Sequence, residues 1–513
     1  MLVAAYEQSK EVRVNIKNFL MNVDTIRKET AVLLDEKKKE ENEQFFSDIS
    51  LANKLASHFR LGKKQYKILD PGAGVGILTA ALIARICKSK TKVEKIEVVA
   101  VESDQSLFSA LHKTMMLCNE LCNALGIEFS FKVINNDFIC LGTEFVKNKG
   151  IGTFNCIIMN PPYKKLSIRD RARKLLISAN LESPNLYSGF LSIAFRMLEK
   201  KGQLVAITPR SFCNGPYFYS FRRDMMEQVS FKKIHTFESR TELFNRDKVL
   251  QENIIFHVIK DKNQKNIIIS SSIGARDKRV NKYKVTLNQL IHPDDSELFI
   301  RIVKNDNDNN YVALMRRLPC TLLDLNIQVS TGKVVDFRNK EFIIKKPRGN
   351  YCPLIYPRHF VNGNIIWPLK TSKPDIILYT PETKGLLLSN DIFVLVKRFT
   401  TKEEEKRVVA AVYDPKNYPQ VNKVAFENRV NYFHKNGEGL QIELAKGLSA
   451  YLNSSLVDMF FRQFNGHTQV NAADLKALKY PTCAQLINIG IQIGDNYSQE
   501  CIDNTVSRVL FYR

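Results

Sequence analysis

Short apolar runs alternate with helical patterns through the first half of this sequence. The clearest run, Thr-Phe-Asn-Cys-Ile-Ile-Met at 153–159, has the length and composition of a buried strand. Helical patterns at 77–87 and 105–125 separate the first three runs, and this alternation is typical of a parallel sheet with helical crossovers. We therefore predict an α/β region whose strands lie at 66–69, 95–101, 129–134, 153–159, 202–209, 231–237 and 253–259.

The sequence before the first predicted strand is polar and has a helical pattern. Apolar residues from Val14 onward recur at helix-like intervals, so residues 1–43 are expected to form a helical arm. A short amphipathic helix is predicted at 49–59, and Ser47 or Asp48 can cap its first turn.

The composition changes past about residue 260. Residues 263–308 are polar and charged, and the sequence beyond them mixes short strand and helix patterns without another glycine-rich turn. A chain of 513 residues exceeds one usual domain, so a second domain is expected. The predicted parts are the helical arm at 1–43, the α/β domain at 44–290 and an α+β domain at 291–513.

Basic residues outnumber acidic ones, with 76 Lys and Arg against 53 Asp and Glu, which gives a net charge of +23. This excess favours a polyanionic partner, although a basic surface without a ligand would have the same composition. No apolar run reaches ~18 residues and no secretory signal is visible, so a cytoplasmic protein without a membrane span is expected. The cysteines form no CxxC and the histidines no HExxH, so reduced thiols and no metal are expected.

A glycine-rich turn links the first predicted strand to the helix after it. The turn is Asp70-Pro71-Gly72-Ala73-Gly74, and the order of strand, glycine turn and helix opens a nucleotide-binding βαβ unit. A dinucleotide would bring a pyrophosphate against Asp70, which charge repulsion disfavours. S-adenosylmethionine carries a sulfonium and an ammonium, which an acid favours, and its carboxylate can use the N-terminus of the helix.

The next two strand ends also carry acids. Glu102 ends the second strand, where a carboxylate can accept from both hydroxyls of a ribose, although a surface acid fits the position too. Asp137 and Phe138 follow the third strand, where the acid can accept from an adenine amino group and the ring can cover the base. Because ligands bind at the carboxyl ends of strands in open α/β sheets, these residues are expected to share one site.

The fourth strand ends in Asn160-Pro161-Pro162-Tyr163. Two prolines cannot continue a sheet ladder or enter a helix interior, so a stiff loop must follow the strand. Asn160 offers an amide oxygen and Tyr163 a flat ring, and this pair suits a planar base with an exocyclic amino group. An ordinary turn would contain the same residues, but the three preceding strand ends favour a ligand site.

The ordered set of four strand ends resembles the class I, S-adenosylmethionine-dependent amino-group methyltransferases. With Gln44-Phe45-Phe46-Ser47 before the glycine turn and a long region after Tyr163, it resembles the γ subgroup of adenine-N6 DNA methyltransferases from bacterial restriction–modification systems. The resemblance implies a Rossmann-like, seven-stranded class I methyltransferase domain followed by an α+β target-recognition domain. The residues expected at the cofactor are Phe46, Ser47, Asp70, Pro71, Gly72, Ala73, Gly74, Glu102, Asp137 and Phe138.

The expected chemistry follows from the target atom. The adenine N6 lone pair is conjugated into the ring, so Asn160 Oδ1 and the carbonyl of Pro161 are expected to accept both N6 hydrogens and free the lone pair. Tyr163 is expected to stack on the base, and Phe46 to face the sulfonium by a cation–π contact. Because the amine lies inside a duplex, the nucleotide must be extruded first.

Residues outside the four strand ends are candidates for contacts with DNA. The basic stretch after Tyr163 can contact phosphates, or it can be a solvated helix face. Phe244 lies where the resembled enzymes place an aromatic on the extruded base, and a core position also fits it. The polar run around residue 467 can meet base edges or can cap a helix. The candidates are Lys164, Lys165, Arg171, Phe244, Lys397, Arg398, His467 and Gln469.

The loop at Asn160 does not by itself select the substrate. An RNA or protein-glutamine N-methyltransferase would share it, and a catalytically silent DNA-binding subunit could keep the same fold. We expect a site-specific DNA adenine-N6 methyltransferase that acts as a monomer on double-stranded DNA in the bacterial cytoplasm, associated with the nucleoid. A cognate restriction endonuclease is expected to be a separate protein, and the recognised DNA sequence does not follow from these residues.

Overall fold

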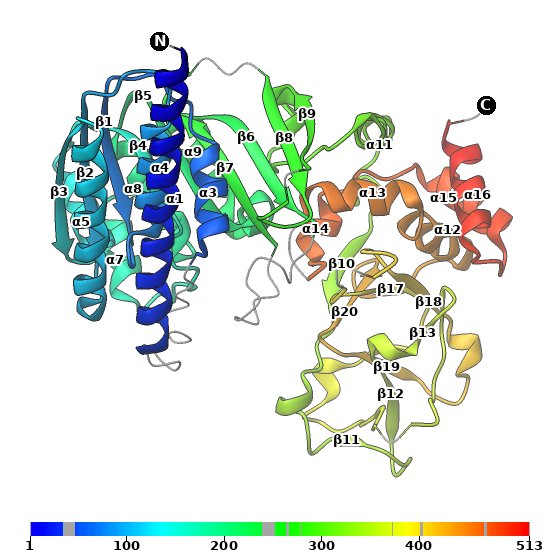
Figure 1. Cartoon of the computed structure of the whole chain (residues 1–513). Helices are drawn as coiled ribbons and strands as arrows, with labels where there is room; N and C mark the ends of the chain where they lie inside the picture. Colours follow the sequence, from blue (N-terminus) through cyan, green and yellow to red (C-terminus); the bar gives the residue numbers. More distant parts are fainter. Residues whose placement is uncertain are drawn as a thin grey trace. The chain divides into compact units, whose positions relative to one another are not determined.

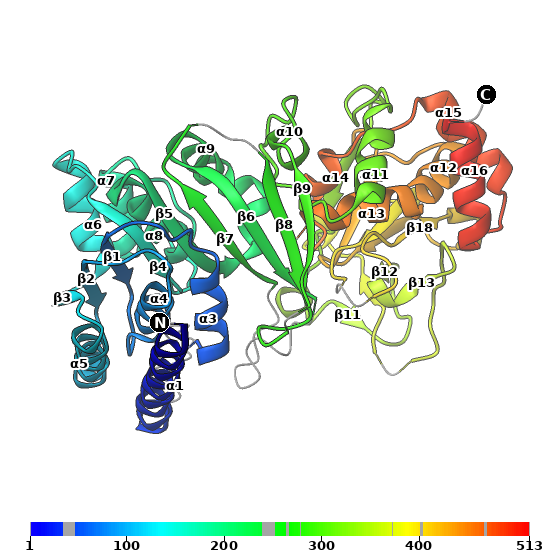
Figure 2. The same ribbon diagram turned by 45° about the horizontal axis from the view of Figure 1, so that its top comes forward.

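A computed structural model of the chain describes residues 2–33, 47–238, 252–262, 266–277, 279–371, 373–400, 404–465 and 469–511. The chain divides into two compact units, Met1–Lys304 and Asn305–Arg513. Figure 1 shows the elements of both units along the chain, and Figure 2 shows them from a second direction. Each unit is described below by itself.

The first unit is built on one large sheet, which in the described residues has nine strands in the order β3-β2-β1-β4-β5-β7-β6-β8-β9. The strands β1 to β5 that lie next to one another pair in parallel, whereas β7 is antiparallel to both β5 and β6. The strands are β1 Gln65–Pro71, β2 Lys95–Glu102, β3 Glu128–Asn135, β4 Phe154–Met159, β5 Leu198–Pro209, β6 Ser230–Phe237, β7 Asn253–Ile259, β8 Ile267–Ser272 and β9 Asn281–Val285.

All seven predicted strands are confirmed, but the prediction that the sheet ends with seven is wrong. Strand β8 pairs in parallel with β6 and β9 pairs with β8, in a region that was predicted to be polar. The serines of β8 are buried, and the hydroxyls of Ser270 and Ser272 lie 2.8 and 2.9 Å from the two ring nitrogens of His235. A strand that buries hydroxyl groups on hydrogen-bond partners does not have the apolar pattern of a core strand.

Helices cover both faces of this sheet and enclose a separate apolar core on each (Figure 2). One set packs together on the first face: α1 Leu2–Leu33, α3 Ile49–Ser57, α4 Ile77–Cys87 and α5 Phe108–Ala124. The second set covers the opposite face: α6 Phe138–Lys147, α7 Arg171–Ser178, α8 Leu186–Met197 and α9 Tyr219–Gln228. The short helix α10, Leu287–Leu290, follows β9.

The N-terminal helix belongs to the first unit. Ile16, Phe19 and Val23 are spaced one helical turn apart and are buried against α4 and α5. Val32, which also fits the apolar spacing, is 84% exposed. The predicted helix is therefore present over residues 2–33, and it lies over the α/β domain, against α4 and α5.

The segment 291–304 also belongs to the first unit, so the domain boundary lies later than the predicted residue 291. Ile300 and Val303 are buried in the core on the second face. The backbone N–H of Ile300 donates to Cys213 O at 2.9 Å, and that of Arg301 donates to Leu290 O at 2.7 Å. These contacts are non-local, and a sequence pattern does not reveal them.

The second unit mixes short strands with helices, as expected for this part of the sequence. Its described strands form a six-stranded sheet, β10-β20-β17-β18-β14-β13, and a five-stranded sheet, β11-β15-β12-β19-β16. The strands are β10 Gln328–Thr331, β11 Ile343–Ile344, β12 Tyr351–Ile355, β13 Phe360–Val361, β14 Asn364–Ile365, β15 Ile376–Leu378, β16 Leu388–Ser389, β17 Phe393–Lys397, β18 Ala410–Tyr413, β19 Lys423–Phe426 and β20 Val430–His434. The helices are α11 Asp306–Arg316, α12 Ile442–Leu452, α13 Ser455–Phe464, α14 Ala472–Lys476, α15 Cys483–Ile493 and α16 Gln499–Phe511.

Candidate active site

The carboxyl ends of β1, β2, β3, β4 and β5 lie at one edge of the sheet, because these strands run in the same direction. This edge brings together the segments that begin at Asp70, Glu102, Asp137 and Asn160, as the sequence predicted from strand order alone. The loop after Pro209, which was not among the predicted site segments, begins at the same edge.

Asp70 is fully buried at the end of β1. Its Oδ2 accepts a hydrogen bond from Thr79 Oγ1 at 2.7 Å, whereas its Oδ1 has no hydrogen-bond partner in the described part of the chain. Burial, together with repulsion by Glu102, raises the pKa of Asp70 from 3.8 to about 7 against the opposing effect of Thr79. A buried carboxylate oxygen without a partner is costly, and a cationic group placed beside it would relieve that cost. The ammonium or sulfonium of S-adenosylmethionine fits this requirement.

The glycine turn is held against the end of β2 by its own backbone. The N–H groups of Gly72 and Ala73 donate to Val101 O at 2.8 and 2.9 Å. Gly76 has φ +81°, and a Cβ there would lie 2.9 Å from side-chain carbons of Leu111 and Met115. Only glycine therefore allows this turn to enter α4 at its observed distance from α5.

Glu102 braces the glycine turn. Its Oε2 accepts from Gly74 N at 2.7 Å, and its Oε1 accepts from Ser103 N and Asp104 N, each at 2.8 Å. The side chain is almost completely buried. Both ribose hydroxyls were predicted to donate to Glu102. A carboxylate has about four acceptor positions and three of them are used here, so one position on Oε2 remains for one of the two hydroxyls.

Asp137 and Phe138 lie at the start of α6. Asp137 caps this helix, because its Oδ1 accepts from Ile139 N at 2.7 Å, and the residue remains exposed at the edge. Phe138 is 3% exposed and packs against Phe190 with their ring centroids 4.9 Å apart. The ring thus contributes mainly to the core, and a role as the cover of an adenine depends on its small exposed rim.

Asn160 is held from two sides. The hydroxyl of Tyr163 donates to Asn160 Oδ1 at 3.0 Å, and Asn160 Nδ2 donates to Ser47 Oγ at 3.2 Å. These bonds fix the orientation of the carboxamide, with its oxygen toward Tyr163 and its nitrogen toward Ser47. A carboxamide oxygen is the type of acceptor that an amino group of a substrate requires.

Tyr163 is 3% exposed, and its burial raises the pKa of its hydroxyl. Its ring meets Tyr187 edge to face with the centroids 6.2 Å apart. The sequence analysis predicted a ring that is available for stacking, but here the ring is covered. Stacking on a base would require that the ring be uncovered first.

Known proteins resemble this chain over nearly its whole length. The type II methyltransferase M.PstI of Providencia stuartii is 40% identical to it over 492 residues, which are 95% of this chain and 96% of M.PstI. This chain is a type II DNA methyltransferase of a restriction–modification system. M.BsuBI of Bacillus subtilis is 39% identical over 489 residues, 92% of this chain and 95% of that protein, and residues 85–244 match the family described as Eco57I restriction-modification methylase. The relationship implies dependence on S-adenosylmethionine, and it sets aside the RNA, protein-glutamine and silent-subunit alternatives.

The fold of the methyltransferase is also found among solved structures. The Type IIL restriction-modification enzyme MmeI, solved in complex with DNA, matches 98% of this chain and 74% of its own with a TM-score of 0.56 and 10% identity. The large, mainly parallel sheet resembles the class I methyltransferase fold, and the sheets of the second unit are additional to it.

Three predicted site residues of the methyltransferase, Phe46, Phe244 and His467, lie outside the described residues. Ser47, which was predicted to lie at the cofactor, accepts a hydrogen bond from Asn160 Nδ2. Lys164, Lys165 and Arg171 are exposed in the segment that follows Tyr163, where the structure does not test their predicted phosphate contacts.

The second unit brings together predicted residues that are far apart in sequence. Arg398 lies just after β17, and its carbonyl accepts from Val470 N at 2.7 Å, while Phe399 forms an isolated bridge with Gln469. Lys397 Nζ lies 5.8 Å from the centroid of the Phe360 ring. The two predicted segments around 398 and 469 therefore form one surface of this unit.

Residues that were not among the predicted site residues support Tyr163. The hydroxyl of Tyr187 lies 2.7 Å from Ser211 Oγ, and its ring stacks on Phe218 with the centroids 5.9 Å apart. Tyr187 is fully buried, and Ser211 and Phe218 belong to the loop after β5. Buried aromatic residues have the pattern of a core. Ser211 and Phe218 therefore could not be separated from ordinary packing residues, whereas the segment 184–187, which contains Tyr187, resembles a segment of the family but was given no role.

The described residues also bear on whether the protein holds a metal ion or spans a membrane. Within the described ranges, no group of three or more His, Cys, Asp or Glu side chains is placed to hold a metal ion. Among the described helices, none combines the length and apolar character needed to span a bilayer.

Proposed function

We propose that this methyltransferase transfers the methyl group of S-adenosylmethionine to the N6 amino group of an extruded adenine at a specific DNA site. The observation that carries the proposal is the fixed carboxamide of Asn160, which lies at the same sheet edge as the partnerless oxygen of Asp70. The Asn160 carboxamide suits an amino group that donates a hydrogen bond to it, and the Asp70 carboxylate suits a cationic cofactor.

On the cofactor side, Asp70 would receive a cationic group, Glu102 a ribose hydroxyl and Asp137 the adenine amino group. The glycine turn allows close approach of the backbone, and the start of α4 can receive the carboxylate. When bound, S-adenosylmethionine supplies an electrophilic methyl group. Phe46 and Ser47 are proposed to complete this side, and Phe138 to cover the adenine ring.

On the substrate side, Asn160 Oδ1 would accept one N6 hydrogen and the carbonyl of Pro161 the other. These two bonds would draw the nitrogen toward tetrahedral geometry and make its lone pair available in line with the methyl group, at about 3 Å. Asn160 is not a base, so the proton leaves N6 after the methyl group has been transferred. Tyr163 would hold the Asn160 carboxamide and, once uncovered, contact the base with its ring.

The second unit is proposed to recognise the target sequence. The surface around Lys397, Arg398 and Gln469 is its best candidate for contacts with phosphates and base edges, with His467 in the segment between. In this proposal the modified site is protected from a cognate endonuclease that is a separate protein, and the enzyme acts as a monomer on double-stranded DNA. Phe244, Lys164, Lys165 and Arg171 would contact DNA from the first unit.

The proposal is tested by incubating the protein with S-adenosylmethionine and unmethylated duplex DNA and analysing the nucleosides by mass spectrometry. N6-methyladenine is expected from the wild type, and it should be lost in Asn160→Ala while cofactor binding persists. Asn123→Ala, which changes an exposed asparagine of α5, is the matched control and should keep full activity. A methylated cytosine as the product, or normal turnover in Asn160→Ala, would refute the proposal.

A further inference from the structure

The loop after β5 exposes one aromatic ring while it buries its neighbours. It comprises the two 3₁₀ turns η2 Arg210–Cys213 and η3 Pro216–Phe218. Phe212, Cys213 and Asn214 are fully buried and Phe218 is 6% exposed, whereas Tyr217 is 83% exposed. Among the side chains described from 212 to 218, Tyr217 is thus the one that faces solvent.

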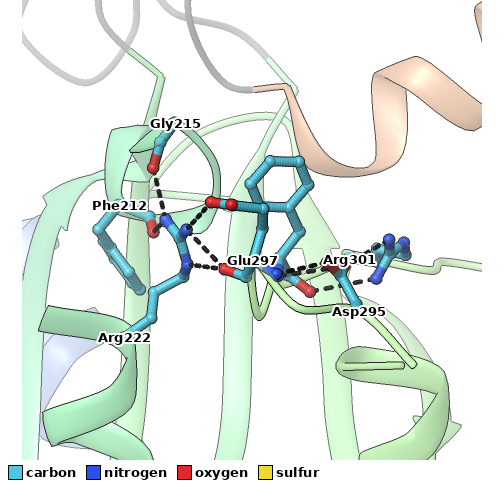
Figure 3. A network of polar contacts seen from close by, with 7 residues as sticks. Phe212, Gly215, Arg222, Asp295, Glu297 and Arg301 are labelled. Atoms are coloured by element: carbon cyan, nitrogen blue, oxygen red, sulfur yellow. Dashed lines mark hydrogen bonds and ion pairs between the residues drawn. The ribbon is translucent and has the colours of Figure 1, made fainter. Parts of the chain in front are cut away.

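A buried arginine fixes the backbone of this loop (Figure 3). Arg222 on α9 is fully buried, and its Nη1 donates to Phe212 O at 3.2 Å and to Gly215 O at 3.0 Å. Its Nε and Nη2 donate to Glu297 O at 2.9 and 2.6 Å, so the same guanidinium ties the loop to the segment before residue 304. The guanidinium also lies 5.2 Å from the centroid of the Phe299 ring.

The segment that contains Glu297, to which Arg222 donates, also contains an ion pair, which Figure 3 shows. Arg301 Nη2 lies 2.7 Å from Asp295 Oδ2, and both side chains are largely buried. The exposed ring of Tyr217 therefore belongs to a loop whose backbone Arg222 ties to the segment that contains Glu297. A residue held in this way loses little conformational freedom when it binds a ligand.

The loop is also coupled to the proposed catalytic segment. Phe218, the residue next to Tyr217, stacks on Tyr187, and Tyr187 meets Tyr163, whose hydroxyl donates to Asn160. Two ring contacts thus separate Phe218 from the loop that carries Asn160. Exposed Lys164 and Lys165 follow Tyr163 in the chain and give this region the positive charge that a DNA backbone would meet.

We propose that Tyr217 stacks on a base of the duplex that is left without its neighbour when the target nucleotide is extruded. This inference rests on the proposed extrusion of an adenine. An aromatic ring that contacts exposed bases stabilises an opened duplex, because every base has a face on which a ring can stack. The ring, rather than the hydroxyl, carries this role.

The inference is tested with Tyr217→Ala and Tyr217→Phe on duplexes that contain the site mapped by sequencing modified plasmid DNA. Methyl incorporation is measured from labelled S-adenosylmethionine, so the readout does not depend on which base is modified. On the matched duplex, kcat/KM of Tyr217→Ala should fall roughly ten-fold or more, in line with the loss of one stacked base. Tyr217→Phe should restore it to near the wild-type value.

A second substrate separates a role in extrusion from a simple contact. When the target nucleotide faces an abasic position, the duplex is already weakened, and the defect of Tyr217→Ala should shrink several-fold. Ile151→Ala, a similarly exposed apolar residue just before β4 at the opposite edge of the sheet, is the control and should match the wild type on both duplexes. Thermal unfolding and cofactor binding of Tyr217→Ala should be unchanged.

Three results would overturn the inference: wild-type kinetics of Tyr217→Ala on the matched duplex, an equal defect on both duplexes, or a change in oligomeric state without a change in DNA kinetics. The last result would assign Tyr217 to a protein interface. If the wild type methylates a base other than adenine, the proposed function is refuted. The comparison of the two duplexes still tests the role of Tyr217, because methyl incorporation is measured whichever base is modified.

Discussion

Three buried histidines should make the first unit sensitive to acid. His58, His235 and His257 are each less than a tenth exposed, and the rings of His58 and His235 lie 5.7 Å apart. Burial is the largest cause that lowers the pKa of His235 and of His257 from 6.5 to about 3, and it lowers that of His58 well below 6.5. Protonation in the folded state would place charges together where water cannot solvate them.

The geometry around His257 identifies its neutral form. Gln203 Oε1 accepts from Arg60 N at 2.8 Å and lies 3.0 Å from His257 Nε2, so Nε2 carries the proton. His257 Nδ1 is buried and has no partner among the described residues. A second proton at Nδ1 would therefore have no acceptor.

The direction in which pH changes the free energy of unfolding follows from proton linkage. Because the pKa of folded His257 is below that of the unfolded chain, the unfolded state binds more protons below about pH 6.5, and the free energy of unfolding falls as the pH falls toward 3. At about pH 5, the protonation of His257 in the unfolded state alone lowers the free energy of unfolding by about 2 kcal/mol. Asp70 acts in the opposite direction, since its folded pKa of about 7 is above its unfolded value. The contribution of His257 must therefore be isolated by substitution.

His257→Gln keeps a donor for Gln203 and removes the titration. Between about pH 7.5 and 5, the variant should lose about 2 kcal/mol less stability than the wild type in urea unfolding. Far-UV circular dichroism follows the whole chain, and fluorescence of the single tryptophan, Trp367, marks the transition of the second unit. His112→Gln changes an exposed histidine and should show no such difference. Equal pH dependence of wild type and His257→Gln, within about 0.5 kcal/mol, would refute the reasoning.

Other variants test the site and its support. Asp70→Asn removes the carboxylate that would receive a cationic group, so S-adenosylmethionine affinity measured by calorimetry should fall at least about ten-fold at pH 8, while unchanged affinity would argue against the placement. Tyr163→Phe keeps the ring but not the bond to Asn160, so kcat should fall roughly ten-fold with little change in DNA affinity; a change in affinity alone would assign Tyr163 to the base instead. Arg222→Leu leaves three carbonyls without their donor, so the free energy of unfolding should fall by about 3–5 kcal/mol, and a cost below about 1 kcal/mol would contradict the buried network.

The sequence predicted the sheet of the first unit well, because its strands are short apolar runs and its turn signals are local. Seven strands, the glycine turn and the loop at Asn160 follow from patterns within a few residues of each site. Strand β8 was missed because its serines bond to His235, which lies more than thirty residues earlier. The boundary near 291 was placed too early because Ile300 and Arg301 contact residues that are far from them in sequence.

The site itself shows why residue type alone does not assign roles. Glu102 and Arg222 are charged, buried and close to the functional edge, yet their hydrogen bonds go largely to backbone groups. Tyr163 is aromatic and lies in the predicted loop, yet its ring is covered and its hydroxyl holds Asn160. The sequence placed Glu102 and Tyr163 at one edge and did not single out Arg222, and it could not distinguish a group that fixes the backbone from one that meets a ligand.

Groups that meet a ligand differ from groups that fix the backbone in one respect: after folding, they still have a hydrogen-bond acceptor or a ring face without a partner. Asp70 Oδ1 is an acceptor without a described partner, and the ring of Tyr217 is 83% exposed. Each is attached to backbone that other buried groups hold in place, so little backbone freedom is lost when a ligand binds. If this arrangement serves preorganisation, a substitution that weakens the hydrogen bonds of Arg222 should reduce the contribution of Tyr217 to kcat/KM on DNA, although the tyrosine ring itself is unchanged. Conservative Arg222→Lys, which retains a charge but not the planar set of donors, should therefore lower kcat/KM on matched DNA more than on the duplex with an abasic partner.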